Sequence, residues 1–324
     1  MHLLLYTNLY PSEESPRHGV FVAERLRHLI GTGALGAEVC ALRPANTMNP
    51  LAYLGRSVSP EQELVSGVKV NNVLVPTLPK VTNWIDPLIW ARATKLIARK
   101  LVDGQTDSVI IDAHFLYPDG VAAVILGQAL QVPVVMSARG SDVNVKARSP
   151  VMRRWMLWAA RRADAVIAGS RDLSANLKLM GIPEEKIHTL PNGVDLDKFR
   201  PVDGCTVRSK YGLTGDVLAS VGNLIEGKGH HLAIESLDRL PGVNLIIVGE
   251  GPDRRRLEQL ARKFGVSDRV RFVGLVPHEE ISEIYSAADI SVLASANEGM
   301  PNVVLESIAC GTPVVATNVG GVKE

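Results

Sequence analysis

Residues 289–317 read DISVLASANEGMPNVVLESIACGTPVVAT and predict a strand, a loop, a helix and a second strand in succession. The apolar run ISVLA has the length and the β-branched content of a buried strand. Pro301 suits the first turn of a helix, and Gly311 suits the left-handed residue that follows its last turn. The run PVVAT then has the pattern of another strand. Such a unit is the building block of an α/β sheet.

The same alternation continues along almost the whole chain. Strand-like runs in the first half are HLLLY, AEVCAL, SVIIDA, VPVVMS, DAVIAG and KIHTL, and those in the second half are VLASV, NLIIVG, RVRFVG, DISVLA and PVVAT. Amphipathic helical patterns separate them, for example VFVAERLRHLI, HHLAIESLDRL, DRRRLEQLARKF and EISEIYSAA. Continuous apolar strands that alternate with helices predict an α/β fold with parallel sheets covered on both faces.

A domain boundary is expected in residues 191–204, PNGVDLDKFRPVDG, because this segment is rich in Pro, Gly and Asp and lacks a clear period. The predicted domains are residues 1–195 and 196–324, each a doubly wound, Rossmann-like sheet. Ligands of such sheets bind beyond the carboxyl ends of the strands. The loops that lead from strand to helix are therefore where the chemistry is expected.

Composition narrows the class of protein. A chain of 324 residues with 46% hydrophobic and 21% charged residues is typical of a globular protein with room for two domains. Its formal charge of +1 argues against bulk nucleic-acid binding. Cys40, Cys205 and Cys310 form no CxxC pair, which favours a reduced, cytoplasmic setting over a zinc site. The N-terminal segment lacks the basic region of a signal peptide, and no segment reaches the roughly 18 apolar residues of a spanning helix.

Glu298 and Glu306 form an E-x7-E spacing across the predicted loop and helix. We expect Glu298 in the loop and Glu306 on the early turns of the helix. The unpaired N–H groups and the dipole at a helix N-terminus attract phosphates, and the two carboxylates can accept hydrogen bonds from hydroxyl groups. A sugar nucleotide fits this combination. The alternative is a helix with two solvated glutamates, since the spacing alone carries little weight.

Residues 221–231, VGNLIEGKGHH, contain the GxxxxGK spacing of a phosphate-binding P-loop at Gly222, Gly227 and Lys228. A P-loop needs Ser or Thr at the next position to hold magnesium, and this chain has Gly229. A P-loop nucleotidase is therefore the weakest of the functions considered. Lys228 either serves phosphates in another way or is a solvated lysine at a helix entrance.

In combination, several segments resemble the retaining family 4 glycosyltransferases of the GT-B fold, over nearly the whole chain. They are NLYPSEESPRHGVFV, HFLYPDG, ADAVIAGSRDLSANL, LPNGVDLDKFRP, VGNLIEGKGHHLAI, VGEGPDRRRLE, FVGLVPHEEI and the E-x7-E helix with ACGTPVVAT and NVGGVKE. The resemblance is strongest to bacterial enzymes of cell-wall and surface polysaccharide assembly. It implies two Rossmann-like domains that face a cleft. The second domain would hold a nucleotide-sugar donor, and the first would mostly hold the acceptor.

Carried over position by position, the resemblance implies catalytic roles for His114, Lys228 and Glu298. Lys228 would grip the diphosphate, Glu298 would contact the donor sugar, and His114 would lie beside that sugar. Asp142 in ARGSD would lie on the acceptor side. The donor-binding positions, which include the ribose-binding Glu306, would be Gly19, Asn223, Glu250, Gly251, Gly274, Leu275, Gly299, Met300, Pro301, Asn302, Val303 and Glu306.

Asn223 departs from the family pattern, because many members have arginine there. Asparagine donates a hydrogen bond but adds no charge, so stabilisation of the leaving group would depend more on Lys228.

Some of the positions named so far, and three other sites, also have structural interpretations. His114 could cap the core, and Asp142 could cap a turn or a helix. The DLD motif at 195–197 follows a linker rather than a buried strand, so we expect no metal role for it. His230 and His231 have no partner at ligand spacing, so surface or interdomain packing is expected for them.

The resemblance implies a retaining transfer that uses neither a protein nucleophile nor a metal or other cofactor. The donor's phosphate oxygen would take the acceptor's proton, while the protein orients the reactants and stabilises the departing negative charge. The expected substrates are a UDP- or GDP-sugar and a glycan or lipid-linked acceptor of envelope or extracellular polysaccharide biosynthesis. Two alternatives stay open: a non-catalytic nucleotide-sugar-binding protein, and a GT-B-fold nucleotide-sugar epimerase.

Two further expectations concern the surroundings of the enzyme. Residues 84–100 and 151–163 are basic and amphipathic. They are either ordinary helices packed on the first sheet or a surface that docks on the anionic inner face of the cytoplasmic membrane. Family members normally continue beyond the final GGVKE. We therefore expect the donor domain to be incomplete at its C-terminus and domain closure to be less well supported.

Overall fold

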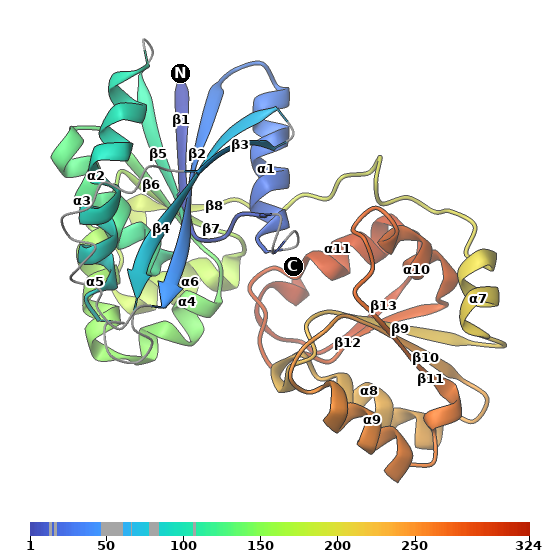
Figure 1. Cartoon of the computed structure of the whole chain (residues 1–324). Helices are drawn as coiled ribbons and strands as arrows, with labels where there is room; N and C mark the ends of the chain where they lie inside the picture. Colours follow the sequence, from blue (N-terminus) through green and yellow to red (C-terminus); the bar gives the residue numbers. More distant parts are fainter. Residues whose placement is uncertain (13–14, 16–17, 47–60, 66, 78–83, 106–107) are drawn as a thin grey trace. The chain divides into compact units, whose positions relative to one another are not determined.

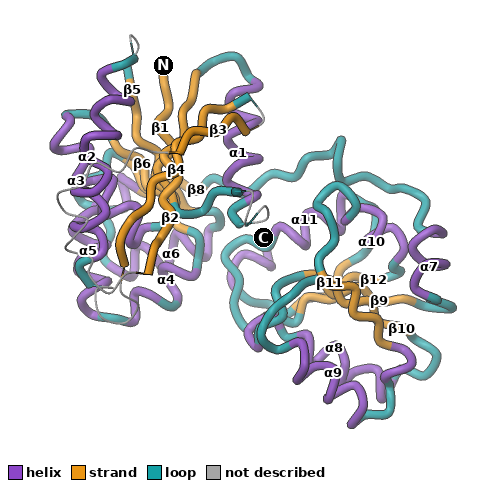
Figure 2. Tube along the Cα trace, viewed as in Figure 1, coloured by secondary structure: helices purple, strands orange, loops and turns teal. Residues whose placement is uncertain are grey.

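The structure is a computed structural model that describes residues 1–324 except 13–14, 16–17, 47–60, 66, 78–83 and 106–107 (Figure 1). The opening motif NLYPSEESPRHGVFV thus lies partly outside the described residues. The chain divides into two compact units, unit 1 (Met1–Leu190) and unit 2 (Pro191–Glu324). Strands and helices alternate in both units (Figure 2).

Unit 1 is built on an eight-stranded sheet with the order β3-β4-β2-β1-β5-β6-β7-β8. All neighbours pair in parallel except β3 and β4. The direction of winding reverses between β1 and β5, so the loops that follow these two strands open at a topological switch point. The strands are β1 (His2–Thr7), β2 (Gly36–Asn46), β3 (Glu61–Val65), β4 (Val68–Thr77), β5 (Val109–His114), β6 (Val134–Ala138), β7 (Ala165–Ala168) and β8 (Ile187–Thr189).

Helices cover both faces of this sheet. Leu3 and Leu5 pack with α1 in one apolar cluster, whereas Leu4 belongs to the cluster that includes α2, α3 and α5. This division explains the run HLLLY, because a strand buried on both faces needs apolar residues at consecutive positions. The helices are α1 (Val20–Gly31), α2 (Asp86–Asp103), α3 (Val121–Leu130), α4 (Ser141–Asn144), α5 (Pro150–Ala160) and α6 (Arg171–Met180).

Unit 2 has a five-stranded parallel sheet with the order β11-β10-β9-β12-β13. Its switch point lies between β9 and β12. One apolar cluster joins α8 and α9 to the sheet, and another joins α7, α10 and α11. The strands are β9 (Val217–Val221), β10 (Asn244–Val248), β11 (Val270–Gly274), β12 (Ile290–Leu293) and β13 (Val314–Ala316); the helices are α7 (Cys205–Tyr211), α8 (His230–Ser236), α9 (Arg254–Lys263), α10 (Ile281–Ala287) and α11 (Asn302–Ala309).

Every strand that the sequence predicts is present, and the prediction of parallel sheets covered on both faces is confirmed. The antiparallel pair β3–β4 was not predicted. Asn71 and Asn72 interrupt the apolar pattern of β4, and the structure buries Asn71 completely. The Asn71 side-chain amide donates to the Val39 carbonyl on β2 at 3.2 Å, which satisfies a polar group that burial would otherwise penalise.

The loops at the carboxyl edge of the unit 2 sheet pack closely on one another. Gly222 N–H donates to the Val248 carbonyl at 2.9 Å, and Gly249 N–H donates to the Gly274 carbonyl at 2.8 Å. Gly249 has φ 139°, and a Cβ atom there would lie 1.9 Å from the Gly222 carbonyl oxygen. Glycine at this position therefore lets the chain after β10 pack directly against the chain after β9.

We expect Gly249→Ala to destabilise the protein by about 2 kcal/mol or more, because the backbone must leave its left-handed conformation and move away from Gly222. The midpoint of thermal unfolding measures the effect. Gly227→Ala is the matched control, since no atom lies within 4 Å of a Cβ added there. Equal midpoints for the two variants would contradict this account of the edge.

Candidate functional site

The switch point of unit 2 brings together the two loops that the sequence singles out. The β9–α8 loop carries Lys228, and the β12–α11 loop carries Glu298. Ala296 N–H donates to the Gly227 carbonyl at 2.9 Å, which fixes the two loops side by side. The carboxyl edge of a doubly wound sheet is where ligands of this architecture bind.

Gly229 explains why this chain lacks the hydroxyl group of a P-loop. The residue has φ 72° and lies between a 3₁₀ turn (Glu226–Lys228) and α8. A Cβ atom at Gly229 would lie 2.0 Å from the Ala294 carbonyl oxygen at the end of β12. Serine or threonine therefore does not fit at this position unless the backbone shifts.

Lys228 and Glu298 form an ion pair, with 2.7 Å between Nζ and Oε1. The Glu298 side chain is 9% exposed and the Lys228 side chain 29% exposed. Weak solvent screening makes such a pair stronger than one on the open surface.

Glu306 lies on the second turn of α11, while Glu298 lies in the loop before it, as predicted. The buried Tyr285 hydroxyl donates to Glu306 Oε2 at 3.1 Å, and His278 Nε2 lies 3.8 Å from Glu306 Oε1. Burial raises the pKa of Tyr285 well above its ordinary value, and the nearby Glu306 carboxylate adds to the rise. Tyr285 therefore stays a hydrogen-bond donor that fixes the direction of Glu306.

The N-terminus of α11 begins after Pro301, whose side chain offers no cap. In the preceding loop, the Gly299 carbonyl accepts from Gly321 N–H at 3.0 Å. Asn302 Oδ1 accepts from the Asn192 amide at 2.8 Å. The segment from Gly299 through Met300 to Val303 is therefore held against two other parts of unit 2; its residues are half-buried except Pro301, which is buried.

The remaining unit 2 positions lie on neighbouring loops of the same edge. Glu250 and Gly251 follow β10, and the Glu250 carboxylate lies 3.5 Å from the Arg254 guanidinium. Gly274 ends β11, and the Leu275 side chain after it is largely exposed. The structure thus gathers the predicted unit 2 positions at one edge of one sheet.

Asn223 is exposed, and its backbone has a defined partner. His230 is buried, and its Nε2 donates to the Asn223 carbonyl at 3.2 Å while Nδ1 meets the Ser220 hydroxyl at 2.8 Å. Burial lowers the pKa of His230. The prediction of surface or interdomain packing for His230 is wrong: this histidine lies inside unit 2, where it shapes the loop that carries Lys228.

In unit 1, Gly19 directly precedes α1 at the switch point, and a Cβ atom there would lie 2.3 Å from the Leu9 carbonyl. His114 ends β5 and is fully buried. The Arg139 guanidinium donates to His114 Nδ1, while His114 Nε2 lies 2.8 Å from Arg25 Nη1 and 3.2 Å from Asp112 Oδ2. Burial lowers the pKa of His114 to about 4, which keeps the imidazole neutral at pH 7.

Asp112 and Arg25 complete this cluster, with 3.0 Å between Arg25 Nη1 and Asp112 Oδ2. Burial alone would raise the pKa of Asp112, but His114, Arg25 and Arg139 outweigh it and lower the pKa to about 2. Sequence reasoning missed Arg25, Asp112 and Arg139. The charged Asp112 near the end of the buried run SVIIDA was the available signal.

Asp142 is fully buried, and its carboxylate accepts three backbone N–H groups. They belong to Leu116 at 2.9 Å, Arg139 at 3.1 Å and Val143 at 3.1 Å. These bonds tie the loop after β5 to the loop after β6. The structure therefore gives Asp142 the capping geometry that the sequence left as one of two alternatives.

Asp119, in the HFLYPDG loop, is a further buried carboxylate that sequence reasoning missed. Its Oδ1 accepts from Asn8 N–H at 2.5 Å, which ties the loop after β5 to the end of β1. Burial raises the pKa of Asp119 to about 7.

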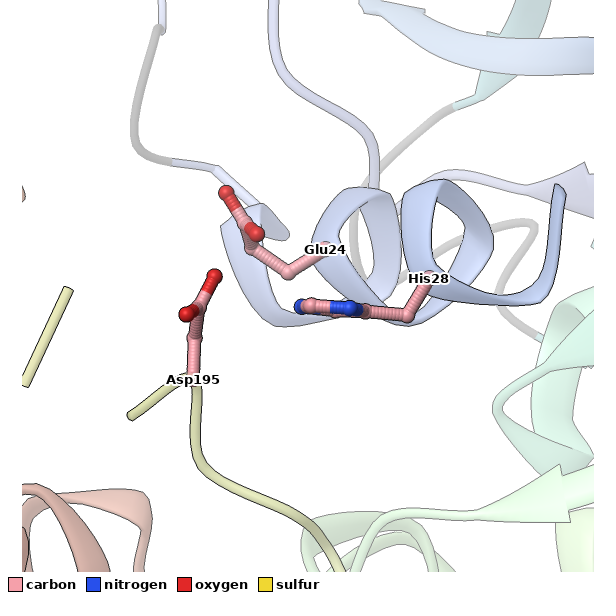
Figure 3. A group of neighbouring side chains, drawn as sticks. All are labelled: Glu24, His28 and Asp195. Carbon is pink, nitrogen blue, oxygen red and sulfur yellow. The ribbon is translucent and has the colours of Figure 1, made fainter. Parts of the chain in front are cut away.

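The DLD motif at 195–197 forms a turn in which Asp195 accepts backbone hydrogen bonds. Asp195 accepts from Asp197 N–H at 3.0 Å and from Lys198 N–H at 3.3 Å. On α1, Glu24 accepts from the Arg27 guanidinium at 3.0 Å. Figure 3 shows Glu24 and His28 one turn apart on the same side of that helix.

The two basic amphipathic segments correspond to α2 and α5. Trp90 is buried in the core of unit 1, and Trp155 and Trp158 pack partly against it. Their apolar faces are thus used in ordinary packing, while Trp84 and Leu96 are exposed. Within the described part of the chain, no helix is both long enough and apolar enough to cross a bilayer.

Comparison with known proteins gives two family matches. The model described as "Glycosyl transferases group 1" matches residues 208–324, and the model described as "Glycosyltransferase Family 4" matches residues 38–198. The putative teichuronic acid biosynthesis glycosyltransferase TuaC of Bacillus subtilis (strain 168) is 32% identical over all of this chain and 82% of its own length. The lipopolysaccharide core biosynthesis glycosyltransferase LpsE of Rhizobium meliloti (strain 1021) is 36% identical over 50% of this chain and 46% of its own length.

Solved structures share the fold over almost the whole chain. Sucrose-phosphate synthase from Thermosynechococcus elongatus has a TM-score of 0.76 at 20% identity, over 99% of this chain and 82% of its own. Anabaena Alr3699/HepE, solved in complex with UDP-glucose, has a TM-score of 0.74 at 20% identity, over 99% and 81%. Because TuaC aligns with the whole of this chain, the chain belongs to the family 4 glycosyltransferases and has their GT-B fold of two Rossmann-like domains.

Proposed function

We propose that this protein transfers a sugar, with retention of configuration, from a UDP- or GDP-sugar to a glycan or lipid-linked acceptor. The observation that carries the proposal is the arrangement of Lys228, Glu298 and Glu306 around the switch point of unit 2. The names of two relatives support an acceptor in envelope polysaccharide, because TuaC is assigned to teichuronic acid biosynthesis and LpsE to lipopolysaccharide core biosynthesis. Alr3699/HepE was solved with UDP-glucose, which supports a nucleotide sugar as donor.

Each group has a proposed role that follows from its chemistry. Lys228 binds the diphosphate together with the first amides of α11, because both favour negative charge. Glu298 accepts hydrogen bonds from the sugar, and Glu306, held by Tyr285, accepts from the ribose. Asn223 donates one further hydrogen bond, so the positive charge at the leaving group comes mainly from Lys228.

The proposed reaction breaks the bond between the sugar C1 and the phosphate oxygen and forms a bond from C1 to the acceptor oxygen on the same face. The acceptor proton moves to the departing phosphate oxygen. No protein nucleophile and no metal ion is required in this scheme, and Gly229 supports it because its packing leaves no room for a magnesium-binding hydroxyl. Both nitrogens of His114 are engaged, so its proposed role is to position groups beside the sugar rather than to transfer a proton.

Binding of nucleotide sugars tests the proposal directly. We expect UDP- or GDP-sugars to raise the unfolding temperature of the wild-type chain, because a ligand of the native state stabilises it. Glu306→Ala should weaken every such donor by about tenfold, since hydrogen bonds to a charged group contribute about 1.5–3 kcal/mol. Glu279→Ala, on an exposed residue near α10, is the control. Unchanged donor affinity in Glu306→Ala would contradict the ribose role.

Loss of the phosphate lysine should affect turnover more than folding. We expect Lys228→Ala to lower kcat by about 10² or more, the effect typical of removing a group that stabilises developing negative charge. Initial rates of sugar transfer measure it, with Lys263→Ala on the exposed face of α9 as the control. A fully active Lys228→Ala enzyme would show that leaving-group stabilisation lies elsewhere.

The proposal includes peripheral contact with an anionic membrane through the exposed faces of α2 and α5. Lys95 and Arg154 are exposed on these faces, near the exposed Trp84 and Leu96. Basic residues beside exposed apolar side chains suit an anionic lipid surface.

We expect the protein to sediment with phosphatidylglycerol vesicles at low salt, and we expect the double variant Lys95→Glu/Arg154→Glu to lose this binding. The control variant Lys210→Glu/Lys263→Glu, in unit 2, has the same net charge as this double variant and should still sediment with the vesicles. Absence of wild-type binding at low salt would remove the membrane part of the proposal without affecting donor binding.

A further inference from the structure

Glu298 pairs with Lys228 in the structure, and the proposed function also makes it a hydrogen-bond acceptor for the donor sugar. Its carboxylate is bonded to Lys228 at 2.7 Å, although Lys228 is the group proposed to bind the donor diphosphate. We propose that Glu298 competes with the diphosphate for Lys228, so that the site discriminates a nucleotide sugar from the bare nucleoside diphosphate. This inference rests on the proposed function and deepens it.

The loop geometry keeps the competitor in place. Ala296 N–H bonds to the Gly227 carbonyl two residues before Glu298, and Gly321 N–H bonds to the Gly299 carbonyl directly after it. Gly320 packs so closely that a Cβ atom there would lie 1.8 Å from the Glu298 carbonyl oxygen. With its backbone held on both sides, the Glu298 carboxylate stays within reach of Lys228.

The neighbouring carboxylates are held by other groups. Glu306 accepts from Tyr285, and Glu226 lies 3.5 Å from the Arg256 guanidinium. Glu298 is therefore the carboxylate that a phosphate group must displace from Lys228. Its side chain is 9% exposed, so water replaces the lost partner poorly.

The sugar changes this balance. When a nucleotide sugar binds, sugar hydroxyl groups can donate to Glu298 and replace the ammonium group that the diphosphate takes. When a bare nucleoside diphosphate binds, Glu298 loses Lys228 and stands beside phosphate groups of like charge. After transfer, the ion pair between Glu298 and Lys228 can form again, and this favours release of the nucleoside diphosphate. Product release is the step that limits turnover in many enzymes.

Isothermal titration of the full chain with UDP, GDP, UDP-glucose, GDP-mannose and inorganic pyrophosphate tests this inference. In Glu298→Gln, we expect the nucleoside diphosphate that matches the donor, and pyrophosphate, to bind about tenfold more tightly than in the wild type. The matching nucleotide sugar should show no such gain. Glu226→Gln is the control, because Glu226 lies in the same turn as Lys228 but pairs with Arg256.

A second variant separates competition from a general change of the site. In the double variant Lys228→Gln/Glu298→Gln, the gain in diphosphate affinity should disappear, because the lysine for which the Glu298 carboxylate and the diphosphate compete is absent. If Glu298→Gln binds nucleoside diphosphate and pyrophosphate no more tightly than the wild type while still binding nucleotide sugars, the inference is overturned and the proposed function stands. If the wild-type chain binds none of the nucleotide sugars, the proposed function fails, and the inference fails with it.

Discussion

The contact between the loop after β9 and the loop after β12 is the constraint on which the chemistry of unit 2 depends. Gly229 packs on the Ala294 carbonyl, and Ala296 donates to Gly227. This contact places Lys228 against Glu298 at 2.7 Å. It also rules out a side chain at the position where a P-loop holds magnesium. One steric requirement thus separates this loop from the P-loops whose spacing it shares.

The carboxyl edge of the unit 1 sheet carries a cluster of buried charged residues. At its switch point, Arg25 pairs with Asp112, and the Arg139 guanidinium donates to the neutral His114. Asp119 and Asp142 accept backbone N–H groups from three different loops and hold the edge in shape.

The sequence was informative wherever local pattern decides structure. Apolar runs located every predicted strand, and the Pro301–Gly311 frame located α11 with Glu298 before it and Glu306 on it. Contacts between distant residues left no local signal. Lys228 and Glu298 are 70 positions apart. The sequence pattern identifies Tyr285 only as an apolar residue of α10, and the structure shows that its hydroxyl donates to Glu306. The sequence predicted a surface or interdomain position for His230, because its partner Ser220 lies in a different, apolar run.

We propose that Lys228, rather than a metal ion, takes up the charge of the departing diphosphate. Rates of sugar transfer from the active UDP- or GDP-sugar, measured in excess EDTA and in magnesium, distinguish these two possibilities. We expect equal rates in the two conditions, because Lys228 and the amides of α11 are proposed to supply the charge. Loss of transfer in EDTA that magnesium or manganese restores would contradict it.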